Sequence, residues 1–207
     1  MTREDSLGWF DRLYREARGD PSAIPWADLA DNPLFVAWCD RRGIDLRSRS
    51  SIVVGCGLGD DAETVAASGG QVTAFDLSPT AIEWCRRRFP KSSVQYVAAD
   101  LLDLPAEWRR AFGFVLEINT LQALPSEDLR PRAIACVADL VAPGGTLLVI
   151  CRGRDASQPA VGPPWPLVAR ELEAFDRAAL TRVSFDDVFD NQQPPVRRFV
   201  VEFSRPV

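Results

Sequence analysis

The stretch Ile52-Val53-Val54-Gly55-Cys56-Gly57-Leu58-Gly59-Asp60-Asp61 decides the fold of this chain. Its apolar start predicts a buried strand, its glycines predict a tight turn, and the residues after them predict a helix. A second strand-like segment, 71–76, ends on Asp76, seventeen residues after Gly59. Glycines let a ligand approach the backbone, and a carboxylate at the next strand end can accept hydrogen bonds from a ribose diol. The order of these features predicts a βαβ unit that binds a nucleoside.

The glycine spacing distinguishes between kinds of nucleoside. The dinucleotide fingerprint G-x-G-x-x-G requires glycine at position 60, where this chain has Asp60. Asp60 and Asp61 would lie at a helix N-terminus, where a pyrophosphate would bind, and two carboxylates would repel it. The sequence therefore favours a cofactor without phosphate and with a positive centre.

Composition and charge narrow the class of protein. The 207 residues suit one α/β domain with a full core, and 46% hydrophobic with 26% charged residues are ordinary for a soluble globular protein. The net charge of −5 provides no basic surface for DNA or RNA, so we expect no nucleic-acid partner. No apolar run approaches the roughly 20 residues of a membrane span, so we expect no membrane partner.

Histidine is absent, and the five cysteines are widely spaced with no C-x-x-C pair. The commonest general base and metal ligand is therefore missing, so we expect no metal site, no zinc enzyme and no Ser-His-Asp hydrolase. The charged start, Arg3-Glu4-Asp5, lacks the apolar core of a signal peptide. We expect a cytoplasmic protein with reduced thiols, acting as a monomer or homodimer.

Hydrophobic periodicity and turn residues predict the remaining elements. Short apolar segments and two longer alternating ones are expected as strands: 51–55, 71–76, 94–98, 112–118, 146–151, 180–189 and 196–204. Helical spacing predicts helices over 5–18, 34–42, 60–68, 79–89, 131–141 and 167–178. Gly43 should end the second helix, Ser78-Pro79 should begin the fourth, and Pro143-Gly144-Gly145 should end the fifth.

This alternation of strands and helices predicts a doubly wound α/β fold with a mostly parallel, seven-stranded sheet. Asn191-Gln192-Gln193-Pro194-Pro195 separates the last two strand-like segments and indicates a terminal hairpin. The sheet should therefore end with one antiparallel C-terminal strand. We expect a single domain over 1–207, with an N-terminal helical lid over 1–47 and the core over 48–207.

Two further motifs extend the pattern. Ala99-Asp100-Leu101 follows the third predicted strand, and Pro143-Gly144-Gly145 precedes the fifth. Together with the G-x-G-x-G turn and Asp76, they resemble the class I S-adenosylmethionine-dependent methyltransferases over about 50–205. The resemblance implies a Rossmann-like form of the fold and S-adenosyl-L-methionine as cofactor.

Local features are similar to a narrower branch, around thiopurine S-methyltransferase and the small thiol and halide methyltransferases. They are the lid with Pro25-Trp26, the phrase over 116–125, the loop over 162–167 and the compact size. The N-P-P-Tyr/Phe signature of amino-group methylation is missing, because the fourth strand ends in Glu117-Ile118-Asn119-Thr120. Lys91 is the only lysine and precedes the third strand, so the catalytic lysine of the catechol type has no counterpart.

Carried onto this sequence, the resemblance implies a set of cofactor contacts. The glycine turn would hold the methionine moiety, Asp76 the ribose, Asp100 with Leu101 the adenine, and Glu117 with Ile118 the region of the sulfonium. The expected cofactor-binding residues are Gly55, Cys56, Gly57, Gly59, Asp76, Leu77, Asp100, Leu101, Glu117 and Ile118. Cys56 is interpreted as a small packing residue rather than a nucleophile, because no basic partner is in view.

The lid and the loop after the fifth strand should close the acceptor pocket. Aromatic side chains there could form its walls, Arg152 could meet an anionic group, and Asn119 could orient a polar group. The substrate-binding candidates are Phe10, Tyr14, Trp26, Asn119, Arg152 and Trp165. No catalytic residue is assigned, and the candidates for that role are Glu117 and Asn119.

Methyl transfer from a sulfonium is an in-line displacement in which the protein mainly aligns the groups and excludes water. An anionic nucleophile needs no base, whereas a neutral hydroxyl or amine does. Without histidine, the sequence favours methyl transfer to a small-molecule acceptor such as a thiol or other soft nucleophile. A halide, a selenium or tellurium species, a phenol and an intermediate of specialised metabolism all stay open. The alternatives are a non-catalytic S-adenosylmethionine-binding regulatory module and an NAD(P)-dependent oxidoreductase. Asp60 and the absence of a Tyr-x-x-x-Lys pair disfavour the oxidoreductase.

Overall fold

The computed structural model describes residues 8–125 and 129–207. Its centre is one mixed sheet built from β1 (Ser50–Val54), β2 (Gln71–Asp76), β3 (Gln95–Ala98), β4 (Phe112–Ile118), β5 (Val141–Arg152), β6 (Thr181–Phe189) and β7 (Arg197–Ser204). The spatial order of the seven strands is β3-β2-β1-β4-β5-β7-β6. Each strand overlaps the segment in which the sequence predicts it, which confirms the Rossmann-like α/β fold.

One strand, β7, runs against the others. It pairs antiparallel with β5, where Ile150 faces Val200, and with β6, where Asp186 faces the same valine. The pairs β1–β2, β1–β4, β2–β3 and β4–β5 are all parallel. The predicted antiparallel C-terminal strand is confirmed. However, the β6–β7 hairpin folds inward, so β7 lies inside the sheet and β6 forms the edge.

The helices also follow the predicted positions. They are α2 (Trp9–Ala17), α3 (Pro33–Arg42), α4 (Asp60–Ala67), α5 (Pro79–Arg88), α6 (Leu129–Leu140) and α7 (Ala169–Arg177), with short 3-10 helices η1 (Pro21–Ala23), η2 (Ala106–Trp108) and η3 (Leu121–Ala123). Residues 5–7 of the first predicted helix lie outside the described residues.

Capping residues define the helix ends as expected. The Ser78 hydroxyl accepts a hydrogen bond of 3.0 Å from the Ala81 N–H, and Pro79 occupies the first turn of α5. Asn32 caps α3, and Gly43, with a φ of +55°, ends it in the left-handed conformation. The starts of α3 and α5 are thereby fixed close to the loops that follow β1 and β2.

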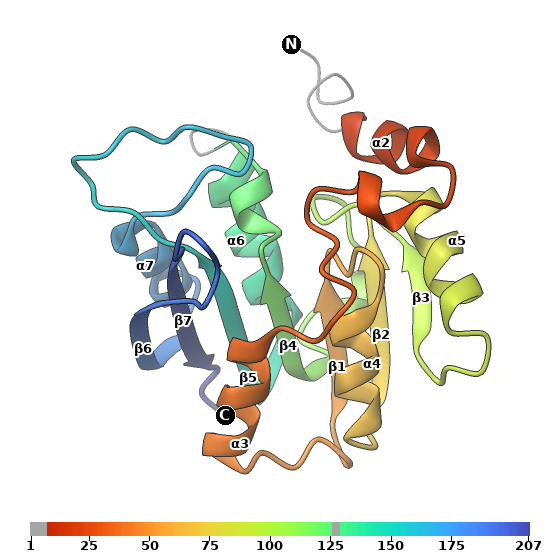
Figure 1. Ribbon diagram of the computed structural model, residues 1–207. Coiled ribbons are helices and arrows are strands. Elements are labelled where there is room, and N and C mark those ends of the chain that lie inside the picture. The colour runs from red at the N-terminus through yellow and green to blue at the C-terminus, as the bar shows by residue number, and fades with distance from the viewer. Residues whose placement is uncertain (1–7, 126–128) are drawn as a thin grey trace.

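Helices cover both faces of the sheet (Figure 1). α3, α4 and α5 pack on one face, where Trp38 and Ile82 join the core of the inner strands. α6 and α7 pack on the other face through side chains such as Val137 and Phe175. The central strands β4 and β5 are therefore apolar on both sides, as parallel strands covered by helices must be.

β5 begins earlier than predicted. Val141 follows α6 directly and pairs with Phe112, and the Pro143-Gly144-Gly145 segment lies within the strand as an irregularity of register. A Cβ at Gly145 would lie only 2.9 Å from the Phe112 carbonyl oxygen, so no larger residue fits without a shift. The prediction that this segment ends the helix is wrong: α6 ends at Leu140, and the glycines bend the strand instead.

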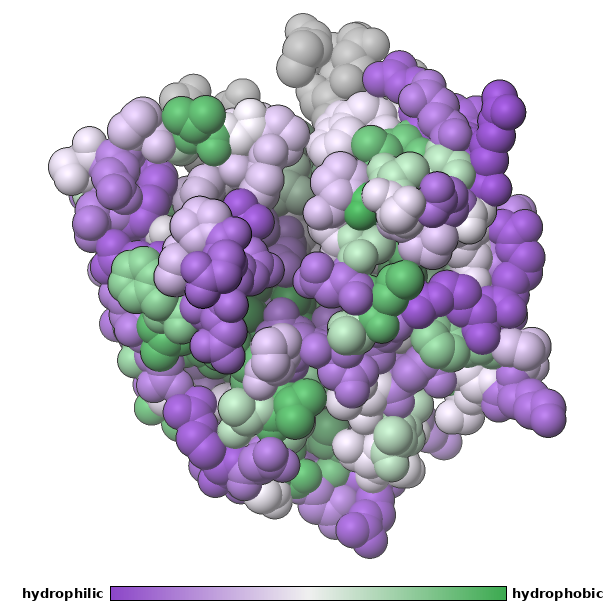
Figure 2. Space-filling model, viewed as in Figure 1, coloured by the Kyte–Doolittle hydropathy of each residue, from purple (hydrophilic) through white to green (hydrophobic). Residues whose placement is uncertain are grey.

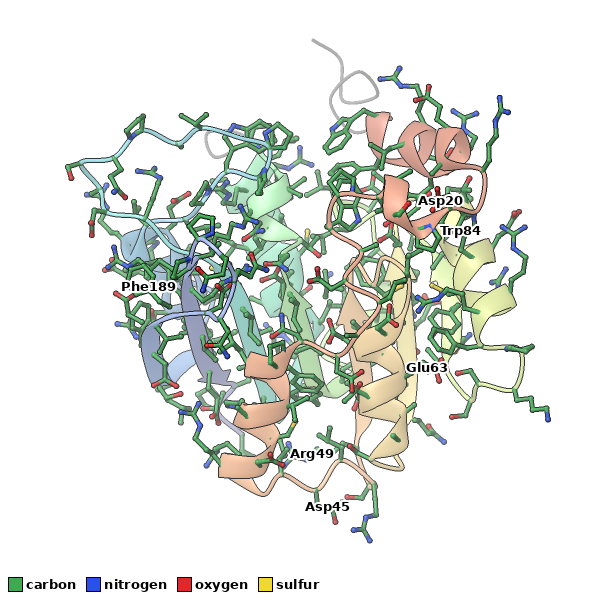
Figure 3. The ribbon with its side chains drawn as sticks, viewed as in Figure 1. Asp20, Asp45, Arg49, Glu63, Trp84 and Phe189 are labelled. Atoms are coloured by element: carbon green, nitrogen blue, oxygen red, sulfur yellow. The ribbon has the colours of Figure 1, made fainter. Side chains whose placement is uncertain are left out.

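The carboxyl ends of the parallel strands share one edge of the sheet, at the top of Figure 1. α2 and η1 lie over one side of this edge, and the 153–168 loop lies over the other. Asp45 and Arg49 mark the opposite edge, at the bottom of Figure 3. None of the helices in the described ranges has the length and apolar character needed to cross a membrane.

Candidate cofactor and acceptor site

The glycine turn after β1 has a conformation that only glycine adopts easily. Gly55, Gly57 and Gly59 have φ values of +60°, +54° and +92°. A Cβ at Gly55 would overlap the Thr120 side chain, and one at Gly59 would lie 2.7 Å from the Tyr96 hydroxyl. Thr120 and Tyr96 therefore pack closely against this turn, which we call the glycine cradle.

Asp76 at the end of β2 is joined to this turn. Its carboxylate accepts hydrogen bonds from the Gly57 N–H at 3.0 Å and from the Ser78 N–H at 2.9 Å. Burial raises the pKa of Asp76 to about 6, although the two N–H donors oppose the shift. The carboxylate has lone pairs left for further donors, so the geometry suits a diol placed beside the glycine turn.

The two acids that follow the turn are already engaged. Arg88 forms a two-pronged ion pair with Asp60, at 2.7 and 2.8 Å. Asp61 accepts a hydrogen bond of 2.8 Å from the Asn32 N–H, and burial raises its pKa to about 6. The start of α4 is thus occupied by protein carboxylates, which agrees with the expectation that no pyrophosphate binds there.

The loop after β3 also lies along the carboxyl edge. Asp100 accepts a hydrogen bond of 2.8 Å from the Leu102 N–H, which fixes the turn. Leu101 is buried, and Leu77, after β2, packs on the same part of the core. The Ala99 N–H donates to the Asp76 carbonyl oxygen at 3.0 Å, so an acid flanked by apolar side chains stands close to Asp76. The assignment of Asp100 and Leu101 to an adenine stays a prediction.

Glu117 lies at the end of β4, and its carboxyl points into the protein interior. It is fully buried, and its Oε1 accepts hydrogen bonds from Thr120 N–H at 2.7 Å and Leu121 N–H at 2.9 Å. Its Oε2 has no hydrogen-bond partner among the described residues, and burial raises its pKa to about 7. Glu117 therefore holds the turn that leads into η3, while Ile118 packs on the opposite face of the sheet.

Three of the predicted wall residues, Phe10, Tyr14 and Trp26, come together in one aromatic cluster. The Trp26 Nε1–H donates a hydrogen bond of 2.8 Å to the Tyr14 hydroxyl, and Phe10 lies edge-on to Trp26 with ring centroids 6.0 Å apart. Trp9, which the sequence analysis did not select, stacks on Phe10 at 4.0 Å. Helical spacing alone could not distinguish Trp9 from a surface residue.

The cluster is fixed to the sheet through α5. Tyr14 of α2 is buried against Trp84 of α5, with ring centroids 5.9 Å apart, and Trp84 is labelled below α2 in Figure 3. Asp11 accepts hydrogen bonds from the Ser78 hydroxyl at 2.8 Å and the Thr80 N–H at 3.2 Å. The first described helix is thus attached to the residues that immediately follow Asp76.

The acceptor side of the edge is formed by β4, β5 and β7. Asn119, with a φ of +64°, donates its backbone N–H to the Ile150 carbonyl oxygen at 2.9 Å. Its side-chain oxygen accepts a hydrogen bond of 3.1 Å from Arg198, which also binds Asp190 at 2.8 Å. Arg152 ends β5 directly opposite Arg198. Arg198 was not predicted, because nothing local in the sequence shows which strand β7 joins.

Trp165 takes a different place from the other aromatic candidates. Its backbone N–H donates a hydrogen bond of 2.6 Å to the Gln122 carbonyl oxygen, and its own carbonyl oxygen accepts one of 2.9 Å from Arg130. Arg130 is buried and forms an ion pair of 2.6 Å with Glu171 on α7. The lid and the 153–168 loop stand on opposite sides of the edge (Figure 1), and the expectation that they close the acceptor pocket stays a prediction.

Cys56 lies inside the glycine turn and packs beside Cys85. Its backbone N–H donates to the Phe75 carbonyl oxygen at 2.9 Å, which extends the β1–β2 pairing. Contact with Cys85 and burial raise the pKa of the Cys56 thiol well above its usual value. These contacts fit the interpretation of Cys56 as a packing residue.

Comparison with known proteins agrees with this arrangement. Residues 52–145 match the family model described as a methyltransferase domain. A relative from Xanthomonas oryzae pv. oryzae, named ubiquinone biosynthesis O-methyltransferase, is 37% identical over 122 residues, which cover 57% of this chain and 48% of the relative. The chain thus spans about half the length of the curated relatives it matches.

Solved structures share the fold over nearly the whole chain. The 1,6-didemethyltoxoflavin-N1-methyltransferase of Burkholderia thailandensis, solved with S-adenosylhomocysteine, has a TM-score of 0.76 at 19% identity and covers 100% of this chain and 92% of its own. The [4+2]-cyclase SpnF also has a TM-score of 0.76, at 18% identity, covering 97% and 95%. Residues 52–145 thus resemble a methyltransferase domain, and the whole chain shares the fold of solved methyltransferases. The N-methyltransferase NodS of Bradyrhizobium japonicum, which shares the fold with a TM-score of 0.70 at 21% identity, was also solved with S-adenosylhomocysteine.

Proposed function

We propose that this chain transfers a methyl group from S-adenosylmethionine to a small-molecule acceptor. The observation that carries the proposal is the hydrogen bond that the Gly57 N–H donates to the Asp76 carboxylate. This bond holds an acid directly beside the glycine turn, where it could accept hydrogen bonds from a ribose. The family match over 52–145 supports the same reading. The fold alone does not establish methyl transfer, because the [4+2]-cyclase SpnF shares it.

The residues at this edge of the sheet fit the cofactor. The glycine cradle accepts the flexible methionine moiety at close range, Asp76 accepts the ribose hydroxyls, and Asp100 with Leu101 meets the adenine. When bound, S-adenosylmethionine supplies an activated methyl group on a sulfonium. We assign Glu117 an indirect role, because its buried carboxylate holds Thr120 against Gly55 rather than facing the cleft.

At the acceptor end the protein can align the acceptor but offers, among its described residues, no strong general base to deprotonate it. The 207 residues contain no histidine, and the carboxyl of Glu117 is fully buried. The aromatic cluster would shield the cofactor side of the edge from water, and the exclusion of water speeds the reaction of an anion with a sulfonium. These features support a thiol or another soft, ionised nucleophile, as in the thiol methyltransferase branch.

A phenolic oxygen is the second candidate acceptor. The relative that is 37% identical over 122 residues carries the name of an O-methyltransferase. A phenol also ionises far more readily than an alcohol, so an enzyme with a weak base can still use it. Parallel assays with small thiols and catechols decide between the two acceptors.

Cofactor binding is tested first, by calorimetric titration with S-adenosylhomocysteine and with NADH. We expect micromolar affinity for S-adenosylhomocysteine, no NADH binding, and loss of affinity in Asp76→Ala. Asp45→Ala removes an exposed carboxylate at the opposite edge of the sheet (Figure 3) and should bind as the wild type does. Wild-type protein that binds NADH instead would establish the oxidoreductase alternative.

Turnover then separates an enzyme from a regulatory module. Purified protein is incubated with S-adenosylmethionine and panels of small thiols and phenols, and the S-adenosylhomocysteine released is measured. Methylation of any acceptor above the background rate establishes the enzyme. Tight cofactor binding without turnover on either panel would favour the non-catalytic module.

A further inference from the structure

Two arginines stand side by side at the acceptor end of the sheet. Arg152, the last residue of β5, is paired in register with Arg198 at the start of β7. Like charges placed opposite each other on neighbouring strands are unfavourable unless other groups compensate them. The contacts of the two guanidinium groups show whether each positive charge is compensated within the protein.

Arg198 is fully compensated. Its Nε lies 2.8 Å from Asp190, and its side chain is only 8% exposed. Its Nη1 also donates a hydrogen bond of 3.1 Å to the Asn119 side-chain oxygen. Arg198 and Asp190 thus form a closed, neutral pair that anchors Asn119, and Asp190 has little left to offer Arg152.

Arg152 has no such partner. Within the described residues its guanidinium forms no ion pair, and its Nε, shielded from solvent, has no hydrogen-bond acceptor. Burial and the nearby Arg198 lower the pKa of Arg152, whereas Asp190 and Asp28 act in the opposite direction. Asp28 is exposed on the N-terminal segment, within electrostatic range of Arg152. An anion bound beside this half-buried guanidinium would supply the counter-charge and the hydrogen-bond acceptor that the described residues do not.

The position of Arg152 is also fixed. The Gln122 side-chain oxygen accepts its backbone N–H at 2.6 Å, so the residue is tied to the turn after β4. The surface is hollowed between the N-terminal segment and the 153–168 loop (Figure 2). Arg152 is the last residue of β5 and so lies at the carboxyl edge of the sheet, where open α/β sheets bind their ligands.

We propose that the methyl acceptor carries a carboxylate and that Arg152 binds it. A guanidinium matches a carboxylate with two parallel hydrogen bonds, which fixes orientation as well as position. Arg152 is then a specificity-determining residue, while Arg198 and Asn119 act as positioning residues around it. The inference rests on the proposed function, because it names the substrate class of the same site.

Matched acids and esters test the proposal without requiring turnover. 2-Mercaptobenzoate and 3,4-dihydroxybenzoate are each compared with their methyl esters, which differ mainly in charge. Each compound is titrated into protein saturated with S-adenosylhomocysteine. We expect at least one acid to bind wild type about tenfold or more tightly than its ester. Arg152→Gln should abolish that preference, and Arg152→Lys should retain part of it.

Two control variants make the test specific. Arg47→Gln removes an arginine that is 80% exposed in the loop before β1 and should leave the preference unchanged. Asp28→Asn tests whether Arg152 serves only to attract the N-terminal segment, and it too should bind the acids as the wild type does. Affinity for S-adenosylhomocysteine should be the same in all variants.

The outcomes separate this inference from the proposed function. Equal affinity for acid and ester, no acid binding at millimolar concentration, or full acid preference in Arg152→Gln would overturn the carboxylate assignment. So would an equal loss in Asp28→Asn. In each of these cases intact S-adenosylhomocysteine binding keeps the cofactor assignment. Failure of the wild type to bind S-adenosylhomocysteine would overturn the proposed function itself.

Discussion

The Asp76 carboxylate accepts a hydrogen bond of 3.0 Å from the Gly57 N–H, and this bond ties the end of β2 to the turn after β1. A second bond, 2.9 Å from the Ser78 N–H, ties the same carboxylate to the start of α5. The acid proposed to bind the ribose is therefore also part of the protein's own framework. Experiments on Asp76 must separate these two roles.

Asp76→Asn is the variant that separates them. It keeps one oxygen for an N–H donor but loses the charge, so S-adenosylhomocysteine affinity should fall about tenfold to a hundredfold. Asp76→Ala leaves both N–H groups without this acceptor and should in addition lower the free energy of unfolding by about 1–3 kcal/mol. Calorimetry and urea unfolding measure the two effects. Unchanged affinity in Asp76→Asn would contradict the assignment of Asp76 to the ribose.

Gly55→Ala should destabilise the protein through one identifiable overlap. The new Cβ would collide with the Thr120 side chain, and the φ of +60° is itself unfavourable for alanine. We expect a loss of roughly 2 kcal/mol or more in the free energy of unfolding. Thr120→Ala added to Gly55→Ala should recover part of that loss. Purely additive losses in urea unfolding would show that Thr120 is not the obstacle.

The Tyr14–Trp26 hydrogen bond should be measurable by a double-mutant cycle. Tyr14→Phe and Trp26→Phe each remove the 2.8 Å bond while keeping an aromatic ring. The coupling free energy should be about 0.5–1.5 kcal/mol, the usual net value of such a bond. Urea unfolding of the wild type, both single variants and the double variant gives this quantity. A coupling of zero would mean that the lid gains nothing from the bond.

Glu117 should make stability depend on pH in a defined direction. Burial raises its pKa from 4.5 to about 7, so the native state holds the proton more tightly than the unfolded state does. Its contribution to stability is therefore complete below pH 4.5 and is lost as the pH rises through about 7. Glu117→Gln mimics the protonated acid at every pH. Its free energy of unfolding should therefore rise above that of the wild type as the pH increases between these values, by at most roughly 3 kcal/mol.

Urea unfolding of wild type and Glu117→Gln at mildly acidic and mildly alkaline pH tests this expectation. The difference in free energy of unfolding between the two proteins should grow with pH. A difference that stays constant would show that Glu117 titrates alike in both states. Glu107→Gln, an exposed acid in η2, is the matched control and should produce no such trend.

Much of the fold could be predicted because its signals are local. The glycine turn, the acid at the end of β2, the Ser78-Pro79 helix start and the alternating segments each depend on neighbouring residues. The direction of Glu117 was also readable in principle. It is two residues from Val115, and alternation along β4 places both side chains on the face covered by α6.

The rest of the site depends on contacts that are distant in sequence. Arg198 reaches Asn119 only because β7 pairs with β5, and Asp11 reaches Ser78 only because α2 crosses α5. Thr120 matters through its closeness to Gly55, which a turn between two predicted elements does not reveal. The nucleoside half of the site was therefore predictable, whereas the acceptor half required the three-dimensional arrangement.

The inward position of β7 has a consequence for how the chain assembles on the ribosome. The strands that carry the glycine turn and Asp76 all precede residue 119, and their parallel pairs can form while later residues are still being synthesised. β5 stays without its outer neighbour until residues 197–204 emerge. Arg198 arrives with that strand, so the contacts around Asn119 and Arg152 are completed after the turn that holds Asp76.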